Sequence, residues 1–260
     1  MRKYFRELYL SLFGSFKVPS NEIHIINSHF VSCNNINIIE NQHVFRQFLK
    51  FLSLKCKFLK IEDAVRMISS GEKVDFPCVS FSFDDGFEEC YSVIAPILEE
   101  FNCNAAFFIN SNYVSSTNDY KVLFEKRINV YSKRPMNWQN IRDLHQRGHI
   151  IGSHTKDHFD LAKLSFDEVV VQIIDDKHKL ENMLNYKCEY FAWPYGQKQH
   201  FSKAAFSICL DNFKYIFSGT NYEDYFSYSG SVINRRHIEP FWKKSHINYF
   251  LSVKKNYATN

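Results

Sequence analysis

Two short segments of the sequence combine carboxylates and imidazoles at spacings suited to holding a divalent metal ion. Asp84 and Asp85 are adjacent and follow the β-favouring run 78–83, while His154 and His158 are four residues apart and would share one face of a helical turn. One carboxylate with two imidazoles leaves positions open for water and substrate, and this set suits zinc, cobalt, nickel, manganese or iron. Each segment also has a plainer interpretation, a turn at Asp-Asp-Gly and two surface histidines.

Both segments follow predicted strands of an alternating pattern. We expect strands at 23–31, 78–83, 105–109, 150–152 and 190–193, and helices at 44–54, 91–101, 141–147 and 165–184. Ser165 with Glu168 three residues later has the form of a capping box at the start of the last helix. Alternating strands and helices indicate a mainly parallel sheet, and a closed or nearly closed barrel covers both of its faces. Because barrel sites form where strands end, we expect Asp84-Asp85, His154 and the 194–196 loop to converge.

Three motifs, in order, carry a family resemblance. Residues 82–87 (SFDDGF), 148–158 (GHIIGSHTKDH) and 191–196 (FAWPYG) resemble the first three motifs of the polysaccharide deacetylase family, carbohydrate esterase family four. The similarity runs from about residue 23 to residue 236. It implies a single-domain α/β fold, a distorted (β/α) barrel with about seven strands. It also implies Asp84 as catalytic base and Asp85, His154 and His158 as ligands of a divalent metal, with zinc the first choice.

The sequence departs from the family's usual pattern in its third motif. Many members have an arginine two residues before the proline, where it orients the base, and this chain has Ala192. The segment 234–240 (NRRHIEP) follows a predicted strand and offers substitutes. Arg236 or Arg235 can take over the role of orienting the base, and of the two we assign Arg236 to it. His237 is assigned as the acid that protonates the leaving amine, with an exposed histidine beside an interaction surface as the alternative.

Further candidates surround the substrate. Residues 28–31 (SHFV) resemble the Tyr-His segment that opens many members acting on surface polysaccharides, which places His29 at the barrel rim; a locally bonded histidine at a strand end is the alternative. Tyr195 and Trp193 are candidates for stacking on a sugar ring. A backbone N–H of the 194–196 loop can stabilise the oxyanion together with the metal.

The remaining composition bounds the setting of the protein. We expect residues 1–20 to hold an amphipathic helix and residues 21–260 to form the barrel domain. That helix, apolar at Phe5, Leu8, Tyr9, Leu12 and Phe13, either docks on the domain, which is favoured, or lies on a membrane surface. A formal charge of +4 from 32 basic and 28 acidic residues is too balanced to indicate a nucleic-acid partner. Seven cysteines without CxxC spacing and no evident cleavage site favour the cytoplasm, with peripheral contact at the inner membrane face as an extension.

The reaction expected from these residues is hydrolysis of an N-acetyl group from an amino sugar, in a glycan or in a lipid-linked or nucleotide-linked precursor. A divalent cation would activate water and polarise the acyl carbonyl, and Asp84 would accept the proton. The same residues are compatible with two alternatives. One is a catalytically silent carbohydrate-binding barrel, and the other is a deformylase or amidase acting on a related substrate.

Overall fold

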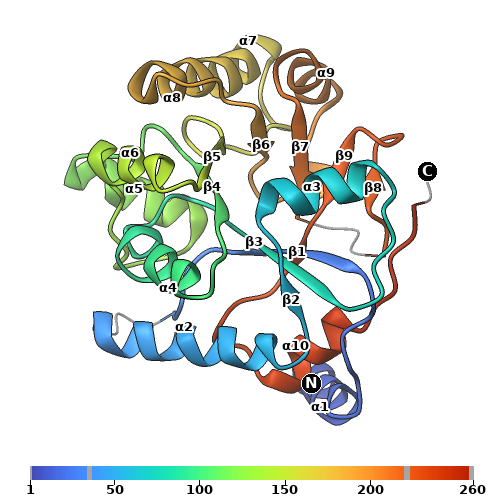
Figure 1. Ribbon diagram of the computed structural model, residues 1–260. Coiled ribbons are helices and arrows are strands. Elements are labelled where there is room, and N and C mark those ends of the chain that lie inside the picture. Colours follow the sequence, from blue (N-terminus) through green and yellow to red (C-terminus); the bar gives the residue numbers. More distant parts are fainter. Residues whose placement is uncertain (1, 34–36, 220–222, 258–260) are drawn as a thin grey trace.

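A curled, mostly parallel sheet forms the centre of the computed structural model, which describes residues 2–33, 37–219 and 223–257 (Figure 1). In this part of the chain ten strands pair in the order β10-β1-β3-β4-β5-β6-β7-β9-β8, with β2 beside β3. All pairings are parallel except that of β8 with β9. The strands are β1 (Ile23–Ser28), β2 (Lys57–Phe58), β3 (Cys78–Phe83), β4 (Ala105–Ile109), β5 (Ile150–Ser153), β6 (Tyr190–Ala192), β7 (Tyr215–Ser218), β8 (Phe226–Ser227), β9 (Val232–Asn234) and β10 (Arg236–His237).

One residue joins the two sides of the curled sheet. β9 pairs with β7 near one end of the strand order and β10 pairs with β1 at the other, yet only Arg235 separates them in sequence. The Arg235 N–H donates to Ser218 O at 3.3 Å, and the Ile238 N–H donates to Asn27 O at 3.1 Å. The sheet therefore curls into the distorted (β/α) barrel expected from the sequence. Seven of the ten described strands have three or more residues; the three two-residue strands β2, β8 and β10 add to the expected number, because such short pairings have no periodicity to detect.

Helices surround the sheet, and most of them cover its outer face (Figure 1). They are α1 (Arg2–Gly14), α2 (Ile38–Ser53), α3 (Ile61–Ser69), α4 (Ala95–Glu100), α5 (Asn118–Ile128), α6 (Trp138–Gln146), α7 (Phe166–Val170), α8 (Asp176–Leu184), α9 (Lys203–Asn212) and α10 (Lys244–Leu251). The expected helix at 91–101 begins as a π-helical turn, Cys90–Ile94, ahead of Pro96, which has no N–H to donate. The expected capping box at Ser165 is present, and a second π-helical turn joins α7 to α8.

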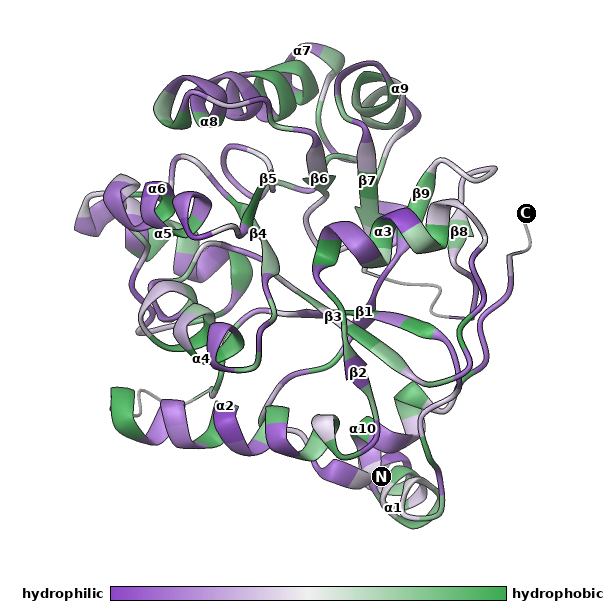
Figure 2. Ribbon diagram, in the orientation of Figure 1, coloured by the Kyte–Doolittle hydropathy of each residue, from purple (hydrophilic) through white to green (hydrophobic). Residues whose placement is uncertain are grey.

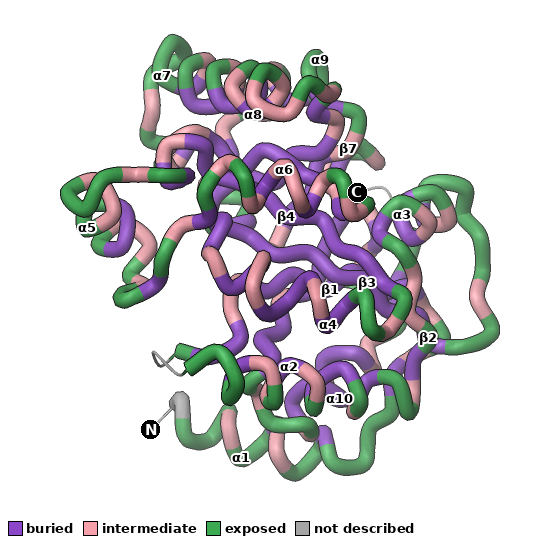
Figure 3. The backbone as a smooth tube through the Cα atoms, turned by 60° about the vertical axis from the view of Figure 1, so that its left-hand side comes forward, coloured by how far each residue is buried: buried purple, intermediate pink, exposed green. Residues whose placement is uncertain are grey.

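Strand alternation divides the core into two clusters. Val79, Phe81 and Phe83 of β3 face outward and pack beneath the surrounding helices. Ile23 and Ile25 of β1 belong to the inner cluster, which includes Phe108 and Phe217 and which α3 closes with four buried side chains. The tube in Figure 3 shows the central strands buried and the outer turns of the helices exposed, and Figure 2 shows hydrophilic residues spread along those helices.

Helix α1 packs against α10 through a close backbone approach. A Cβ at Gly14 would lie 2.0 Å from Ser245 O, so only glycine fits at this contact. Ser11 Oγ lies 3.1 Å from His246 Nε2, which fixes the other end of the contact. No helix in the described residues is long and apolar enough to cross a membrane.

Candidate metal centre

The predicted metal ligands come together where β3 and β5 end. Asp85 follows β3, His154 directly follows β5 and His158 lies in the loop beyond it, and all three are buried. Asp85 Oδ1 lies 3.3 Å from His158 Nε2 and 3.6 Å from His154 Nε2. Ligand atoms at ordinary zinc distances in a tetrahedral site are roughly 3.3 Å apart. The three atoms are therefore spaced as ligands around one ion.

The burial and hydrogen bonding of these residues leave atoms available to bind a cation. Asp85 Oδ1 and His158 Nδ1 are buried without a hydrogen-bond partner among the described residues. His154 Nδ1 lies 2.7 Å from Ala192 O, so this nitrogen donates and Nε2 is left as the metal-facing acceptor. Buried polar atoms without partners are costly, and a bound cation would satisfy the Asp85 oxygen. The residues present fit a divalent metal.

The loop that carries the histidines differs from the helical turn considered above. Residues 154–160 form an irregular loop, and His158 and Thr155 have left-handed backbone angles, as does Asp85 (φ 74°). Such conformations in residues other than glycine cost free energy and concentrate at functional sites. Asp157 anchors the loop, because its carboxylate accepts hydrogen bonds from Asn112 (2.8 Å), Gln172 (2.7 Å) and Tyr120. The two imidazoles nevertheless meet, with ring centroids 5.1 Å apart.

Burial sets the charge state of this cluster. Burial raises the pKa of Asp85 to about 7, although the nearby His29 charge opposes it. Burial also lowers the pKa of His154 to about 4 and lowers that of His158 well below its usual value. Both histidines are therefore neutral near pH 7, as metal ligation requires. A cation between them would supply the positive charge that keeps Asp85 ionised.

Asp84 is held by Arg235, not by the Arg236 that we assigned from the sequence. Arg235 makes a bidentate ion pair, with NH1 to Oδ1 at 2.7 Å and NH2 to Oδ2 at 2.9 Å, and its NH1 also reaches Ser82 Oγ at 3.1 Å. Arg236 faces the other way, with its guanidinium 3.9 Å from the Phe250 ring centroid. The choice of Arg236 was therefore wrong, because alternation turns only every second residue of this segment into the barrel.

The interior of the barrel is shaped to receive Arg235. Its guanidinium lies 4.9 Å from the Phe108 ring centroid and its Nε donates to Ser218 O at 3.0 Å. A Cβ at Gly152 would come within 2.6 Å of the Phe108 ring, so the glycine of the second motif makes room for that ring. Burial alone would raise the pKa of Asp84, but the Arg235 charge and hydrogen bonds outweigh it and hold this pKa well below its usual range. Asp84 is ionised.

A second cluster contains the other two predicted histidines and a carboxylate that sequence reasoning gave no role. Glu239 Oε1 lies 2.7 Å from His29 Nδ1 and 2.9 Å from His237 Nε2. These distances are those of direct hydrogen bonds and are shorter than the roughly 3.3 Å between ligands of a tetrahedral metal. We therefore interpret this cluster as a hydrogen-bonded network. Its only signal in the sequence is a glutamate two residues after His237.

One pocket of about 350 Å³ joins the two clusters. Asp85 and His158 line it together with His29, His237 and Glu239. Of the two histidines in this second cluster, His29 is the one whose charge acts on both Asp84 and Asp85, whereas His237 has a side chain 43% exposed. Burial by itself would lower the pKa of His29, but the Glu239 carboxylate raises it to about 9. The expected position of His29 at the site rim is therefore observed, and His29 is protonated near neutral pH.

The two aromatic candidates, Tyr195 and Trp193, lie in different environments. Tyr195 lines the pocket with 43% of its surface exposed, and its ring centroid is 4.9 Å from that of His158. Trp193 is 1% exposed and stacks on Phe201 in the outer core, with its indole N–H donated to Gln197 O at 3.1 Å. The expectation that Trp193 contacts a sugar is wrong, because this residue faces outward from the end of β6. Tyr195 stays available to a substrate.

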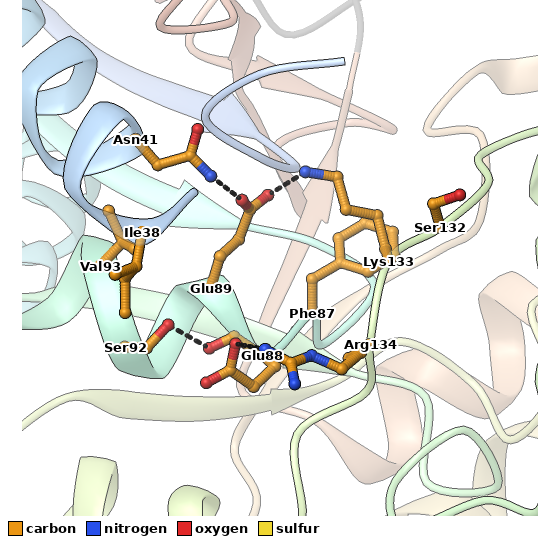
Figure 4. Close-up of a pocket in the computed structure, with 10 residues that line it drawn as sticks. All are labelled: Ile38, Asn41, Phe87, Glu88, Glu89, Ser92, Val93, Ser132, Lys133 and Arg134. Atoms are coloured by element: carbon orange, nitrogen blue, oxygen red, sulfur yellow. Dashed lines mark hydrogen bonds and ion pairs between the residues drawn. The ribbon is translucent and has the colours of Figure 1, made fainter. Parts of the chain in front are cut away.

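A buried ion pair supports the loop beside the site (Figure 4). Glu89 lies between Asn41, which donates at 3.2 Å, and Lys133, whose Nζ is 2.9 Å from Glu89 Oε1 (Figure 4). Lys133 Nζ also donates to Ser32 O at 2.9 Å and lies 4.9 Å from the Phe30 ring centroid. This pair thus connects the loop after His29 to the turn after Asp85. No pattern in the sequence indicates this ion pair.

Comparison with known proteins places these motifs in a family. The family model described as polysaccharide deacetylase matches residues 71–207, more than half of the chain. The Bacillus subtilis (strain 168) protein YxkH, named for the polysaccharide deacetylases, is 23% identical over 136 residues, which cover 52% of this chain and 43% of YxkH. The chain spans half or less of the length of the curated relatives it matches.

Two solved structures share the fold. The Streptococcus pyogenes deacetylase PplD, in complex with acetate, superposes with a TM-score of 0.67 and 21% identity, over 90% of this chain and 99% of PplD. IcaB from Ammonifex degensii superposes with a TM-score of 0.70 and 16% identity, over 91% of this chain and 99% of IcaB. At these identities the similarity establishes the barrel fold.

Proposed function

Because this chain belongs to the polysaccharide deacetylase family, we propose that it hydrolyses the N-acetyl group of an amino sugar in a glycan or glycan precursor, using a divalent metal. The observation that carries the proposal is the joint placement of two sets of residues. Asp85, His154 and His158 form a candidate ligand set, and the ionised Asp84 lies beside it with both oxygens hydrogen-bonded to Arg235. The relative PplD is described as a deacetylase in complex with acetate, which is the product this reaction would release.

Asp84 is proposed as the general base. Its two oxygens accept from the Arg235 fork, which fixes the plane of the carboxylate, and its low pKa keeps it ionised at neutral pH. A carboxylate this acidic accepts a proton only from a strongly acidified donor. When bound, a divalent cation, zinc or a related metal, acidifies water and polarises the acyl carbonyl. The low basicity of Asp84 therefore supports the proposal that the reaction uses a metal.

His29, in place of the His237 proposed from sequence, fits the general acid. Its Nδ1 donates to Glu239, which leaves Nε2–H available, and the raised pKa keeps that proton in place near pH 7. The amine leaves readily only if it is protonated, so a cationic imidazole facing Asp84 and Asp85 supplies what the step needs. Glu239 then holds His29 as Arg235 holds Asp84. His237 also hydrogen-bonds to the Glu239 carboxylate, and its side chain is the more exposed of the two histidines.

The loop after β6 offers the donor for the oxyanion. Pro194 has no N–H, and the Gly196 N–H is donated to Trp193 O at 3.2 Å. The Tyr195 N–H is the remaining donor of this loop, and its residue has the strained backbone angle φ 65°. The exposed Tyr195 ring is proposed to pack on the sugar that carries the acyl group.

The experiment is acetate release by the metal-loaded protein from a panel of soluble N-acetylated saccharides, with formate measured in parallel. We expect acetate from at least one member and none above background with Asp84→Asn, which keeps the shape of the side chain and removes its charge. His29→Gln should lower kcat by about a hundredfold or more, as expected for loss of a general acid. His237→Gln, its matched control on the same Glu239 oxygen, should lose less than tenfold. Equal losses in the two variants would overturn the assignment of His29, and no acetate across the panel would overturn the proposed function.

A further inference from the structure

Helix α1 turns its apolar residues toward solvent instead of toward the protein. Leu10 and Gly14 are the buried positions among its described side chains; Gly14 lies against Ser245 of α10, and Leu10 lines a pocket with His246 and Phe250 of α10. The residues that we call the α1 apolar face are all exposed: Tyr4, Phe5, Leu8, Tyr9, Leu12, Phe13, Phe16 and Val18. Phe16 is 83% exposed and Tyr4 70%. A surface helix normally buries its apolar stripe, and a contiguous exposed patch of this kind marks an interaction site.

Positive charge borders the α1 apolar face. Arg6 and Lys17 are exposed on the α1 segment, and Lys243 and Lys244 are exposed at the start of the adjoining α10. The one acidic side chain among the described residues of these two segments is Glu7, which lies 3.8 Å from Lys243 Nζ. Aromatic and aliphatic side chains flanked by lysine and arginine suit the headgroup region of an anionic lipid surface, where the rings enter the interface and the cations meet phosphates.

The length of α1 separates lying on a membrane from crossing it. Thirteen helical residues extend about 20 Å, less than the roughly 30 Å of a bilayer core. The helix is also fixed along α10 by its close contact at Gly14, so its axis follows the protein surface. Figure 3 shows α1 at the edge of the molecule beside α10. We propose that the α1 apolar face docks this protein on an anionic lipid surface, with α1 in the plane of the headgroups.

This docking would hold the proposed active site close to the lipid. Phe241 and Trp242 line both the pocket beside Arg6 and Leu10 and the pocket that contains Asp85. The Trp242 ring centroid is 5.1 Å from that of His237. Two neighbouring side chains thus separate the membrane-facing helix from the site. The substrate class that this geometry indicates is a saccharide carried on a lipid or lying along the membrane surface. This last step rests on the proposed function.

The test is co-sedimentation of the full chain with vesicles of phosphatidylcholine alone and with phosphatidylglycerol added. We expect binding to the anionic vesicles that weakens with salt. Leu8→Ser/Leu12→Ser should lower the vesicle partition coefficient at least about tenfold, because two large side chains no longer enter the interface. Val122→Ser/Leu123→Ser on α5 is the matched control, since those residues are 60% and 59% exposed against 54% and 57%, and it should bind like the wild type. Circular dichroism and melting temperature confirm that each variant is folded.

Three results would overturn the docking surface. The first is no binding to anionic vesicles, and the second is equal binding by the wild type and the Leu8→Ser/Leu12→Ser variant. The third is that light scattering shows the wild type as a dimer and the Leu8→Ser/Leu12→Ser variant as a monomer, while neither binds vesicles. Vesicle binding needs no catalysis, so acetate release from soluble saccharides tests the proposed function separately. If both hold, wild type should hydrolyse a vesicle-bound lipid-linked saccharide faster than the Leu8→Ser/Leu12→Ser variant, with equal rates on a soluble one. Equal rates on both would refute the substrate class and leave the two other conclusions standing.

Discussion

Replacement of Arg235 by methionine is expected to damage both stability and catalysis, in amounts that follow from its contacts. The substitution leaves the buried Asp84 carboxylate without its ion pair and removes four hydrogen bonds, two of them to Asp84. Breaking a buried pair by removing one partner costs about 3 to 5 kcal/mol, so the free energy of unfolding should fall by that amount. Urea unfolding of the wild type and the variant measures it.

The catalytic effect is separate from the loss of stability. Without the guanidinium fork the Asp84 carboxylate loses its fixed plane. Charge-assisted hydrogen bonds contribute about 1.5 to 3 kcal/mol each, so loss of one orienting bond in the transition state corresponds to roughly ten- to a hundredfold in kcat. Arg235→Lys should keep the charge and recover part of the stability, but it should stay impaired in kcat because ammonium cannot bind both oxygens at once. KM should change little, since Arg235 lies inside the barrel beneath the site.

Arg236→Met is the matched control for this prediction. It makes the same chemical change one residue further along, on a side chain that lies over Phe250 and faces away from Asp84. Acetate release and bound metal are measured for both variants at a temperature where each is folded. The reasoning is refuted if Arg236→Met lowers kcat as much as Arg235→Met, or if Arg235→Met retains kcat within about threefold of the wild type.

Three further outcomes follow from the same geometry. Removal of metal by a chelator should abolish acetate release and lower the melting temperature, re-addition should restore both, and Asp85→Asn should fail to retain metal in dialysis. Lys133→Met should lower the free energy of unfolding by roughly 3 kcal/mol in urea, and adding Glu89→Gln should recover part of that loss; equal losses would contradict a charge effect. Burial lowers the pKa of His24 to about 3, so between pH 6.5 and 3 the unfolded chain binds a proton that the folded chain does not, and stability falls as the pH falls. From pH 7.5 to 5 the wild type should therefore lose about 2 kcal/mol more than His24→Gln, and parallel losses would count against it.

The sequence predicted best those parts of the fold that depend on local patterns. β3 and β4 have the boundaries expected from their apolar runs, because six and five consecutive buried residues need both faces covered. The start of α7 was fixed by a capping box whose partners are three residues apart. The candidate metal ligands, assigned from the family resemblance, lie together as expected, because each is at or near the end of a predicted strand and strand ends of a parallel sheet meet at one rim.

The errors arose where one residue of register decides which way a side chain faces. β9 has three residues and β10 two, too few for alternation to show that Arg235 enters the barrel and Arg236 leaves it. Trp193 follows β6 in a run that is apolar throughout, so the sequence held no sign that its ring belongs to the outer core. In both cases the residue type suited the expected role, and the sequence left undecided only whether the side chain faces into the barrel or outward.

The hydrogen bond between His29 and Glu239 shows why the proposed proton donor could not be chosen from sequence. His29 and Glu239 are 210 residues apart, and they meet because β10 pairs with β1 through two residues, Ile26 with Arg236 and Asn27 with His237. The same short pairing, one residue beyond Arg235, brings the base-holding arginine into the barrel. A shift of one residue in this register would turn Arg236 inward and remove Glu239 from His29. The pairing of β1 with β10 therefore positions both Arg235, which holds the proposed base Asp84, and Glu239, which holds the proposed acid His29. A chain with Ala192 in place of the family's arginine depends on this pairing for both.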